Sequence, residues 1–166
     1  MKKLIAVSDA TPLIALSKLE KLSWLRDIFG EVIIPEAVYE EIVVKGQGRA
    51  GYEEIKTSGW IRTIPVADRI RTNYLLTQLD PGESEAIVLA EELNADWLLM
   101  DEIHGRAIAQ RLGLSIVGTV GILVLAKQRG WIPEVRALLD ALIEQNFWLS
   151  QAMYKAVLRD VGELKD

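Results

Sequence analysis

The stretch Leu4-Ile5-Ala6-Val7-Ser8-Asp9 is a short apolar run that ends at a charged residue. A brief run with polar boundaries is typical of a buried strand in a parallel sheet. It is too short for the apolar region of a secretory signal, which needs roughly 7–15 residues. We therefore expect a cytoplasmic protein whose first strand ends at Asp9.

Outward from this run, the chain alternates between short apolar segments and helical patterns. Three more strands are predicted, at Val32 to Ile34, Trp97 to Met100 and Ser115 to Val117. Helices are predicted over residues 13–19, 36–44, 84–93, 102–112, 120–129 and 151–161, with another after Pro133. Such alternation implies right-handed crossovers and a mainly parallel sheet covered on both faces. The predicted fold is an α/β, three-layer α/β/α sandwich.

The predicted core covers residues 1–132. Residues 133–166 are expected to form a helical extension that packs on the same domain or on a dimer partner. Lys45 to Gly59 has the weakest pattern, with three glycines, and we expect a mobile loop there. No apolar stretch reaches the roughly 20 residues of a membrane span, so no membrane association is predicted.

Composition restricts the chemistry of any metal site. The chain has no cysteine and one histidine, which excludes thiol catalysis and zinc sites built from several histidines. A bound metal must therefore be held mainly by oxygen. The formal net charge of −5 argues against a broad surface that coats nucleic acid, but not against an enzyme that cuts it.

Carboxylates stand where the predicted strands end. Asp9 follows the first strand and Asp101-Glu102 follows the strand that starts at Trp97. Ligands bind at this edge of open α/β sheets. Glu40 and Glu41, and also Glu83, lie near the starts of helices that leave or approach the same edge. Converging carboxylates repel unless a divalent cation neutralises them, and all-oxygen coordination suits Mg²⁺ or Mn²⁺. The chemistry indicated is metal-assisted hydrolysis of a phosphodiester.

Each acid also has a structural interpretation. Asp101 could only cap the following helix, and Glu83 could complete a capping box with Asp80. Glu40, Glu41 and Glu85 could be solvated helix positions. The structural interpretation is weakest for Asp9, because Thr11 and Pro12 already provide a cap and a first turn.

The acidic motifs resemble, in order, those of the PIN-domain nuclease family, and more narrowly a prokaryotic branch that often forms the toxin half of toxin-antitoxin pairs. The resemblance covers roughly residues 4–132 and rests on four segments: Ser8-Asp9-Ala10-Thr11-Pro12, Ile34-Pro35-Glu36-Ala37-Val38-Tyr39-Glu40-Glu41, Leu79-Asp80-Pro81-Gly82-Glu83-Ser84-Glu85 and Leu98-Leu99-Met100-Asp101-Glu102.

Carried over by position, the resemblance implies four catalytic acids: Asp9, Glu41, Glu83 and Asp101. The implied metal ligands are Asp9, Glu83, Asp101 and Glu102, with Thr11 and Arg106 as residues that contact substrate or support the site. Three departures matter, one of which is that residues 133–166 lie beyond the common core of the family. Met100 stands where the family commonly has a small hydroxyl residue, so either Asp101 or Glu102 could be functional. Glu83 stands where the wider family more often has an aspartate. Separately, the choice of Glu41 over Glu40 as the functional glutamate stays open.

The resemblance further implies a sheet of about five parallel strands, endoribonuclease activity with Mg²⁺ or Mn²⁺, frequent homodimers and inhibition by a small antitoxin. Arg106 is the first candidate for binding RNA phosphates; an i,i+4 ion pair with Glu102 is the alternative. His104 is interpreted as a surface helix residue.

Two rival functions remain at this point. A non-catalytic PIN-like module could bind RNA or protein with the same fold. A receiver-like or phosphatase-like phosphoacceptor domain is disfavoured. Thr11 stands where haloacid-type phosphatases have a second aspartate, and in a receiver the Glu83 motif would have no role.

Overall fold

The computed structural model of the protein describes residues 2–164. Along the chain these residues divide into two compact units, and the boundary falls between Gly118 and Thr119. The first unit contains β1 (Ala6–Ser8), α1 (Ala10–Lys18), α2 (Ser23–Phe29), β2 (Val32–Ile34), α3 (Glu36–Tyr39), the π-helical segment η1 (Glu40–Val44), α4 (Tyr52–Thr57), β3 (Ile61–Thr63), α5 (Arg69–Leu75), α6 (Pro81–Glu92), β4 (Trp97–Leu99), α7 (Ile103–Arg111) and β5 (Ile116–Val117). The second unit contains α8 (Thr119–Gln128), α9 (Arg136–Glu144) and α10 (Gln151–Asp160).

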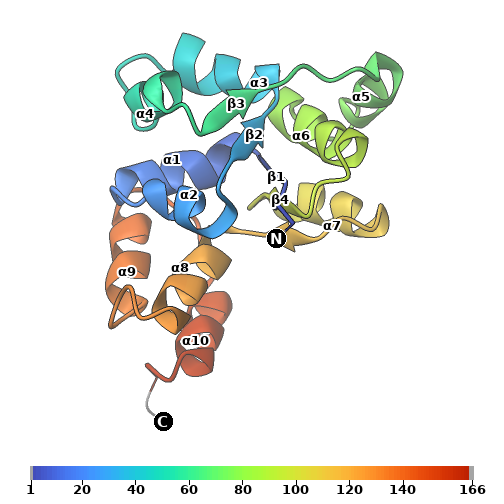
Figure 1. The fold of residues 1–166 in the computed structure, drawn as a ribbon. Coiled ribbons are helices and arrows are strands. Elements are labelled where there is room, and N and C mark those ends of the chain that lie inside the picture. Colours follow the sequence, from blue (N-terminus) through green and yellow to red (C-terminus); the bar gives the residue numbers. More distant parts are fainter. Residues whose placement is uncertain (1, 165–166) are drawn as a thin grey trace. The chain divides into compact units, whose positions relative to one another are not determined.

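The sheet of the first unit has five parallel strands in the order β3-β2-β1-β4-β5. The predicted α/β fold with three layers is confirmed. The chain adds β2 and β3 on one side of β1, and β4 and β5 on the other side. Because each crossover is right-handed, the connecting helices of these two halves cover opposite faces of the sheet. The reversal of strand order occurs between β1 and β4, which lie side by side (Figure 1).

The core of this unit is built on β1 and α6. The β1 residues Ala6 and Val7 are fully buried, as a central strand covered on both faces requires. In α6, every residue from Gly82 to Ala90 is buried, and α6 contacts both β1 and β4. This burial holds the first turn of α6 against the ends of the two central strands.

Three helices and one strand were not predicted. They are α2, α4, α5 and β3, and α4 lies inside the segment predicted to be a loop. The strand β3 was missed because it is short and at the sheet edge, with Arg62 and Thr63 exposed, so it lacks an apolar run. Helices α2, α4 and α5 have only six or seven residues, too few for a helical period to stand out.

In residues 119–164, the described part of the second unit, all regular secondary structure is helical. Its α9 and α10 correspond to the two predicted C-terminal helices, and α8 ends before Gly130, whose φ of +77° is a left-handed stop. The predicted domain division at residue 132 stays a prediction. Among residues 2–164, no helix is both long and apolar enough to cross a membrane.

Candidate active site at the ends of the central strands

Asp9 directly follows β1, at the point where the strand order reverses. Its backbone N–H donates to Leu99 O at 2.9 Å, so the residue is fixed to the neighbouring strand β4. Helix α1 begins at Ala10, two residues before Pro12, and Asp9 rather than Thr11 takes the N-cap position, without a side-chain capping bond. The Asp9 carboxyl therefore lies where β1 ends and α1 begins, at the edge where open α/β sheets bind ligands.

Asp9 is only 4% exposed, and this burial raises the pKa of its carboxyl group to about 8. A hydrogen bond from the Ala10 backbone partly offsets the shift, while the charges of Asp80, Glu83 and Glu41 add to it. We call Asp9, Glu41, Asp80 and Glu83 the acidic cluster. Its members come from β1, η1 and the start of α6, which topology brings together.

Gly82 lets two carboxylates of the cluster share one small space. A Cβ at this position would lie 3.1 Å from Asp9 Oδ1 and 3.4 Å from Glu41 Oε2. A larger residue at position 82 would therefore crowd Asp9 Oδ1 and contact Glu41 Oε2. The glycine keeps open the gap that the two carboxylates border.

The π-helical segment separates the roles of Glu40 and Glu41. In η1 the Lys45 N–H donates to Glu40 O at 2.8 Å, a spacing of five residues, and such insertions are frequent at functional sites. Glu41 turns toward Gly82, and its pKa is raised by partial burial and then by the charge of Asp80. Glu40 instead forms a long, exposed ion pair with Lys45 at 3.9 Å.

Asp80 and Glu83 form the capping box that was one of the two interpretations of Glu83. The Glu83 N–H donates to Asp80 Oδ1 at 2.8 Å, and the Asp80 N–H donates to Glu83 Oε2 at 3.2 Å. Glu83 is 8% exposed, and burial raises its pKa to about 7 despite that hydrogen bond; Asp80 and Glu102 add to the rise. Sequence reasoning treated Asp80 only as a cap, although its charge acts on three other carboxyl groups.

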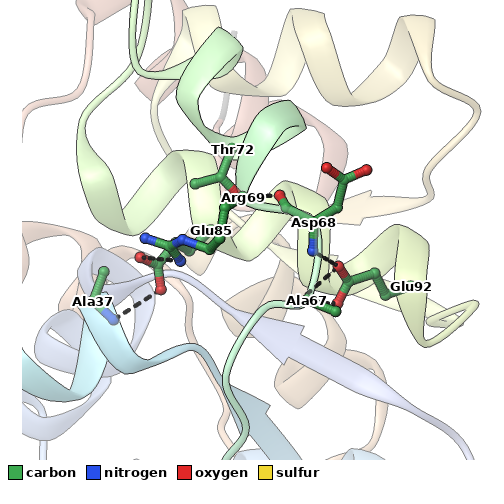
Figure 2. A network of polar contacts seen from close by, with 7 residues as sticks. All are labelled: Ala37, Ala67, Asp68, Arg69, Thr72, Glu85 and Glu92. Carbon is green, nitrogen blue, oxygen red and sulfur yellow. Dashed lines mark hydrogen bonds and ion pairs between the residues drawn. The ribbon is translucent and has the colours of Figure 1, made fainter.

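Glu85 lies two residues further along α6 and has a different role. It is buried rather than solvated as the structural interpretation had it, and it accepts from the Ala37 N–H at 3.2 Å (Figure 2). Arg69 on α5 donates to its other oxygen at 3.5 Å. Glu92, at the other end of α6, accepts from the backbone of Ala67 and Asp68. These two glutamates anchor α3 and the segment before α5 to α6.

The carboxylates after β4 are engaged differently from the acidic cluster. Glu102, not Asp101, caps α7, because its Oε2 accepts from the Gly105 N–H at 2.6 Å. A Cβ at Gly118 would lie 2.7 Å from Asp101 Oδ1 and 2.8 Å from Arg106 Nη1, so these two side chains border the same space. Arg106 also donates to Met100 O at 2.8 Å. The β4 end is thus stabilised by a cap and an arginine.

Two other predicted residues have exposed positions. Thr11 lies in the first turn of α1, two residues after Asp9, and is exposed. His104 is exposed on α7, as its interpretation as a surface residue requires. The functional roles predicted for Thr11 and Arg106 stay predictions.

Beside the acidic cluster lies a cavity of about 240 Å³. Its lining residues are Ala37, Glu40, Glu41, Lys45, Asp80, Pro81 and Gly82. Among residues 2–164, no three His, Cys, Asp or Glu side chains are arranged to hold a metal ion by themselves. Mg²⁺ commonly uses one or two carboxylates and completes its shell with water and substrate phosphate. The Asp9 and Glu41 oxygens that both lie close to Gly82 fit that requirement.

The fold and the site define the class: an α/β protein that carries carboxylates at the carboxyl ends of its central strands, the edge where open α/β sheets bind ligands. A family model described as a PIN domain matches residues 5–163, so the chain belongs to the PIN-domain family. PIN domains are generally nucleases, which supports a nuclease role. No curated protein gives a significant match. The family resemblance predicted from the acidic motifs is confirmed; the toxin-antitoxin branch stays a prediction.

Proposed function

We propose that the protein is a divalent-metal-dependent endoribonuclease that hydrolyses RNA phosphodiester bonds at the acidic cluster. The observation that carries this proposal is the buried Asp9 carboxyl beside Glu41 Oε2 at Gly82, within a family that generally consists of nucleases. Burial raises the Asp9 pKa, and the charges of Asp80, Glu83 and Glu41 raise it further; a bound cation would favour the charged form against both effects.

In this proposal Asp9 and Glu41 hold Mg²⁺ or Mn²⁺. The bound ion would activate a water and stabilise charge on the phosphate. Glu83, with a pKa of about 7, is suited to accept a proton near neutral pH, because general bases work best when their pKa is close to the operating pH. Asp101 and Glu102 support the site from the β4 end, and Thr11 orients substrate near Asp9.

The decisive experiment measures cleavage of mixed-sequence single-stranded RNA by the full chain with Mg²⁺ or Mn²⁺. Asp9→Asn should lower the rate by about 10³-fold, since catalytic electrostatic groups contribute on this scale. Asp27→Asn is the matched control, because Asp27 is an exposed aspartate on α2 whose ion pair with Arg26 is 3.6 Å long. Equal cleavage by wild type and Asp9→Asn would overturn the mechanism.

The alternative function is a non-catalytic PIN-like module. It predicts that the wild-type chain cleaves no RNA and that millimolar Mn²⁺ leaves the melting temperature unchanged. The nuclease proposal predicts a higher melting temperature in Mn²⁺, because a ligand that binds only the folded state stabilises it by mass action.

We also propose a small inhibitory antitoxin and a homodimer, both supported by the family resemblance alone. The test is copurification of the chain with the product of any small neighbouring reading frame, followed by measurement of its mass in solution. A monomer that carries no inhibitor, from a locus without such a reading frame, contradicts both.

A further inference from the structure

The cavity beside the acidic cluster contains one basic residue among those that line it, Lys45. The others that carry charge are Glu40, Glu41 and Asp80. A nucleic-acid strand brings a negative charge with every phosphate, and lysine and arginine side chains supply most of the affinity by neutralising these charges. A positive group at an otherwise acidic cavity therefore needs an explanation.

The backbone of Lys45 is held firmly. Its N–H closes the η1 hydrogen-bond pattern on Glu40 O at 2.8 Å, and the next residue is Gly46. Gly46 is packed so tightly that an added Cβ would lie 3.0 Å from Glu41 O and closer still to Ile42 O. The same turn that directs Glu41 toward Gly82 therefore fixes the origin of the Lys45 side chain.

The side chain of Lys45 forms an exposed ion pair with Glu40, and its charge also lowers the pKa of Glu41. It is 74% exposed, and its partner Glu40 is 58% exposed and 3.9 Å away. Exposed ion pairs of this kind contribute little to stability. The two arginines near the ends of the site are engaged more closely: Arg106 donates to Met100 O at 2.8 Å, and Arg69 pairs with the buried Glu85. Lys45 is thus placed to exchange Glu40 for a phosphate.

We infer that Lys45 binds a phosphate of the RNA strand next to the one that is cleaved. This inference rests on the proposed nuclease function and adds to it a residue that the acidic motifs did not indicate. The oxygens of Asp9 and Glu41 border the Gly82 gap, whereas Lys45 stands at the exposed rim of the cavity. A contact at the rim strengthens binding equally in the ground state and the transition state.

The first test is steady-state cleavage of single-stranded RNA with Mg²⁺ or Mn²⁺. Lys45→Gln should raise KM about tenfold and leave kcat nearly unchanged, since a charge-assisted contact is worth about one such factor. Lys45→Arg should restore most of the affinity. Lys3→Gln is the matched control: Lys3 is 70% exposed, pairs with Glu31 at 3.6 Å and precedes β1, at the opposite edge of the sheet.

A second test separates phosphate binding from a structural role of the ion pair. Removing Glu40 with Glu40→Gln leaves Lys45 free, so RNA affinity should rise or stay the same. If the pair with Glu40 were all that Lys45 provides, Glu40→Gln and Lys45→Gln would weaken RNA binding alike. That result would contradict the inference, as would a KM for Lys45→Gln equal to that of Lys3→Gln.

A third test uses salt. Binding of a fluorescein-labelled single-stranded RNA is measured in an Asp9→Asn background with Mg²⁺, where cleavage is suppressed. Loss of one phosphate contact should reduce the slope of log K against log salt by about 0.7 for single-stranded nucleic acid. If the wild-type enzyme cleaves RNA but Lys45→Gln leaves this slope unchanged, the role of Lys45 is refuted and the nuclease proposal stands. A wild-type chain that cleaves no RNA refutes the nuclease proposal itself.

Discussion

The ends of the two central strands both carry carboxylates, but these have different surroundings. After β1, Asp9 is buried without a side-chain capping bond, and this burial raises its pKa to about 8, with smaller contributions from the charges of the neighbouring acids. After β4, Glu102 caps α7 and Asp101 shares its surroundings with Arg106. The two strands are adjacent and parallel, and Ser8 at the end of β1 is paired with Leu99 at the end of β4. Position at the edge of a sheet therefore does not by itself decide what an acid does.

The difference lies in what each carboxylate interacts with. A helix N-terminus or an arginine stabilises the charged form of an acid, and such an acid contributes to the fold. An acid that is buried among other acids destabilises the metal-free fold and gains from a cation. A related contrast occurs within α6. Glu85 accepts from Ala37 and Arg69, whereas Glu83 accepts from the Asp80 N–H and still has its pKa raised, by burial and by the charges of Asp80 and Glu102.

The largest expected effect is on the stability of the metal-free protein at high pH. Asp9 has a folded pKa of about 8 against an ordinary value of 3.8, so the folded state binds more protons across this interval. Its contribution to stability therefore falls as pH rises from about 4 to 8. Asp9→Asn, which cannot ionise, should remove this dependence and stabilise the chain at pH 9 by on the order of 6 kcal/mol.

Urea unfolding in EDTA between pH 5 and pH 9 measures this effect. The matched variant is Asp101→Asn at the β4 end, which should lower stability, because it leaves Arg106 beside an uncharged group. If both substitutions changed stability in the same direction at pH 9, the contrast between the two strand ends would be lost.

Next in size is the effect of filling the Gly82 gap. Gly82→Ala places a methyl group 3.1 Å from Asp9 Oδ1 and 3.4 Å from Glu41 Oε2. Displacing catalytic groups by a fraction of an ångström to 1 Å can reduce a rate by about 100-fold, and we expect a loss of that order. The free energy of unfolding should change little, because the gain of about 1 kcal/mol from replacing glycine by alanine in a helix offsets the cost of crowding Asp9.

Gly105→Ala is the matched substitution in the first turn of α7. Its added methyl would lie 2.7 Å from Met100 Sδ, the end region of a flexible side chain, and 3.4 Å from Glu102 Oε2. It should lower the melting temperature and spare most of the cleavage rate. A Gly82→Ala enzyme that retains full activity would show that the gap between Asp9 and Glu41 is not where the chemistry occurs.

A smaller effect is expected for metal binding as a function of pH. Ligands must lose their protons before they bind a cation, so Mn²⁺ affinity should increase with pH up to about 8, where Asp9 titrates. The increase should approach about tenfold per pH unit while one proton is released. Calorimetry in buffers of different ionisation enthalpy gives both the affinity and the proton count; pH-independent binding with no proton release would separate the cation from Asp9.

Much of the fold was predictable because its strands are buried on both faces. The runs at Val32 to Ile34 and Trp97 to Met100 have the unbroken apolar character of central strands, and their bounds agree with the structure to within a residue. The edge strand β3 has no such signal, since its pairing with β2 is provided by backbone groups of any sequence. Nor does the sequence show that Glu40 begins a π-helical segment.

The candidate site was predictable as a set of acids but not as a geometry. Strand ends and helix starts identified Asp9 and Glu83, because topology alone brings those positions together. The approach of Glu41 to Gly82 depends on the five-residue turn of η1, which no spacing rule indicated. Asp80 and Lys45 were missed, as one satisfied a capping motif and the other lay in a segment without pattern.

The smallest expected effect concerns Glu102, which was predicted as a metal ligand and is found as the cap of α7. Removing a capping side chain costs about 1 kcal/mol, so Glu102→Ala should lower the free energy of unfolding by that amount. Glu102→Gln keeps an oxygen that can accept from the Gly105 N–H and should retain part of the stability. If Glu102 acts only as a cap, both variants cleave RNA with the wild-type dependence on Mn²⁺ concentration. A weaker Mn²⁺ response in Glu102→Gln, without loss of stability, would instead join the β4 end to the acidic cluster, through the charge by which Glu102 already raises the pKa of Glu83.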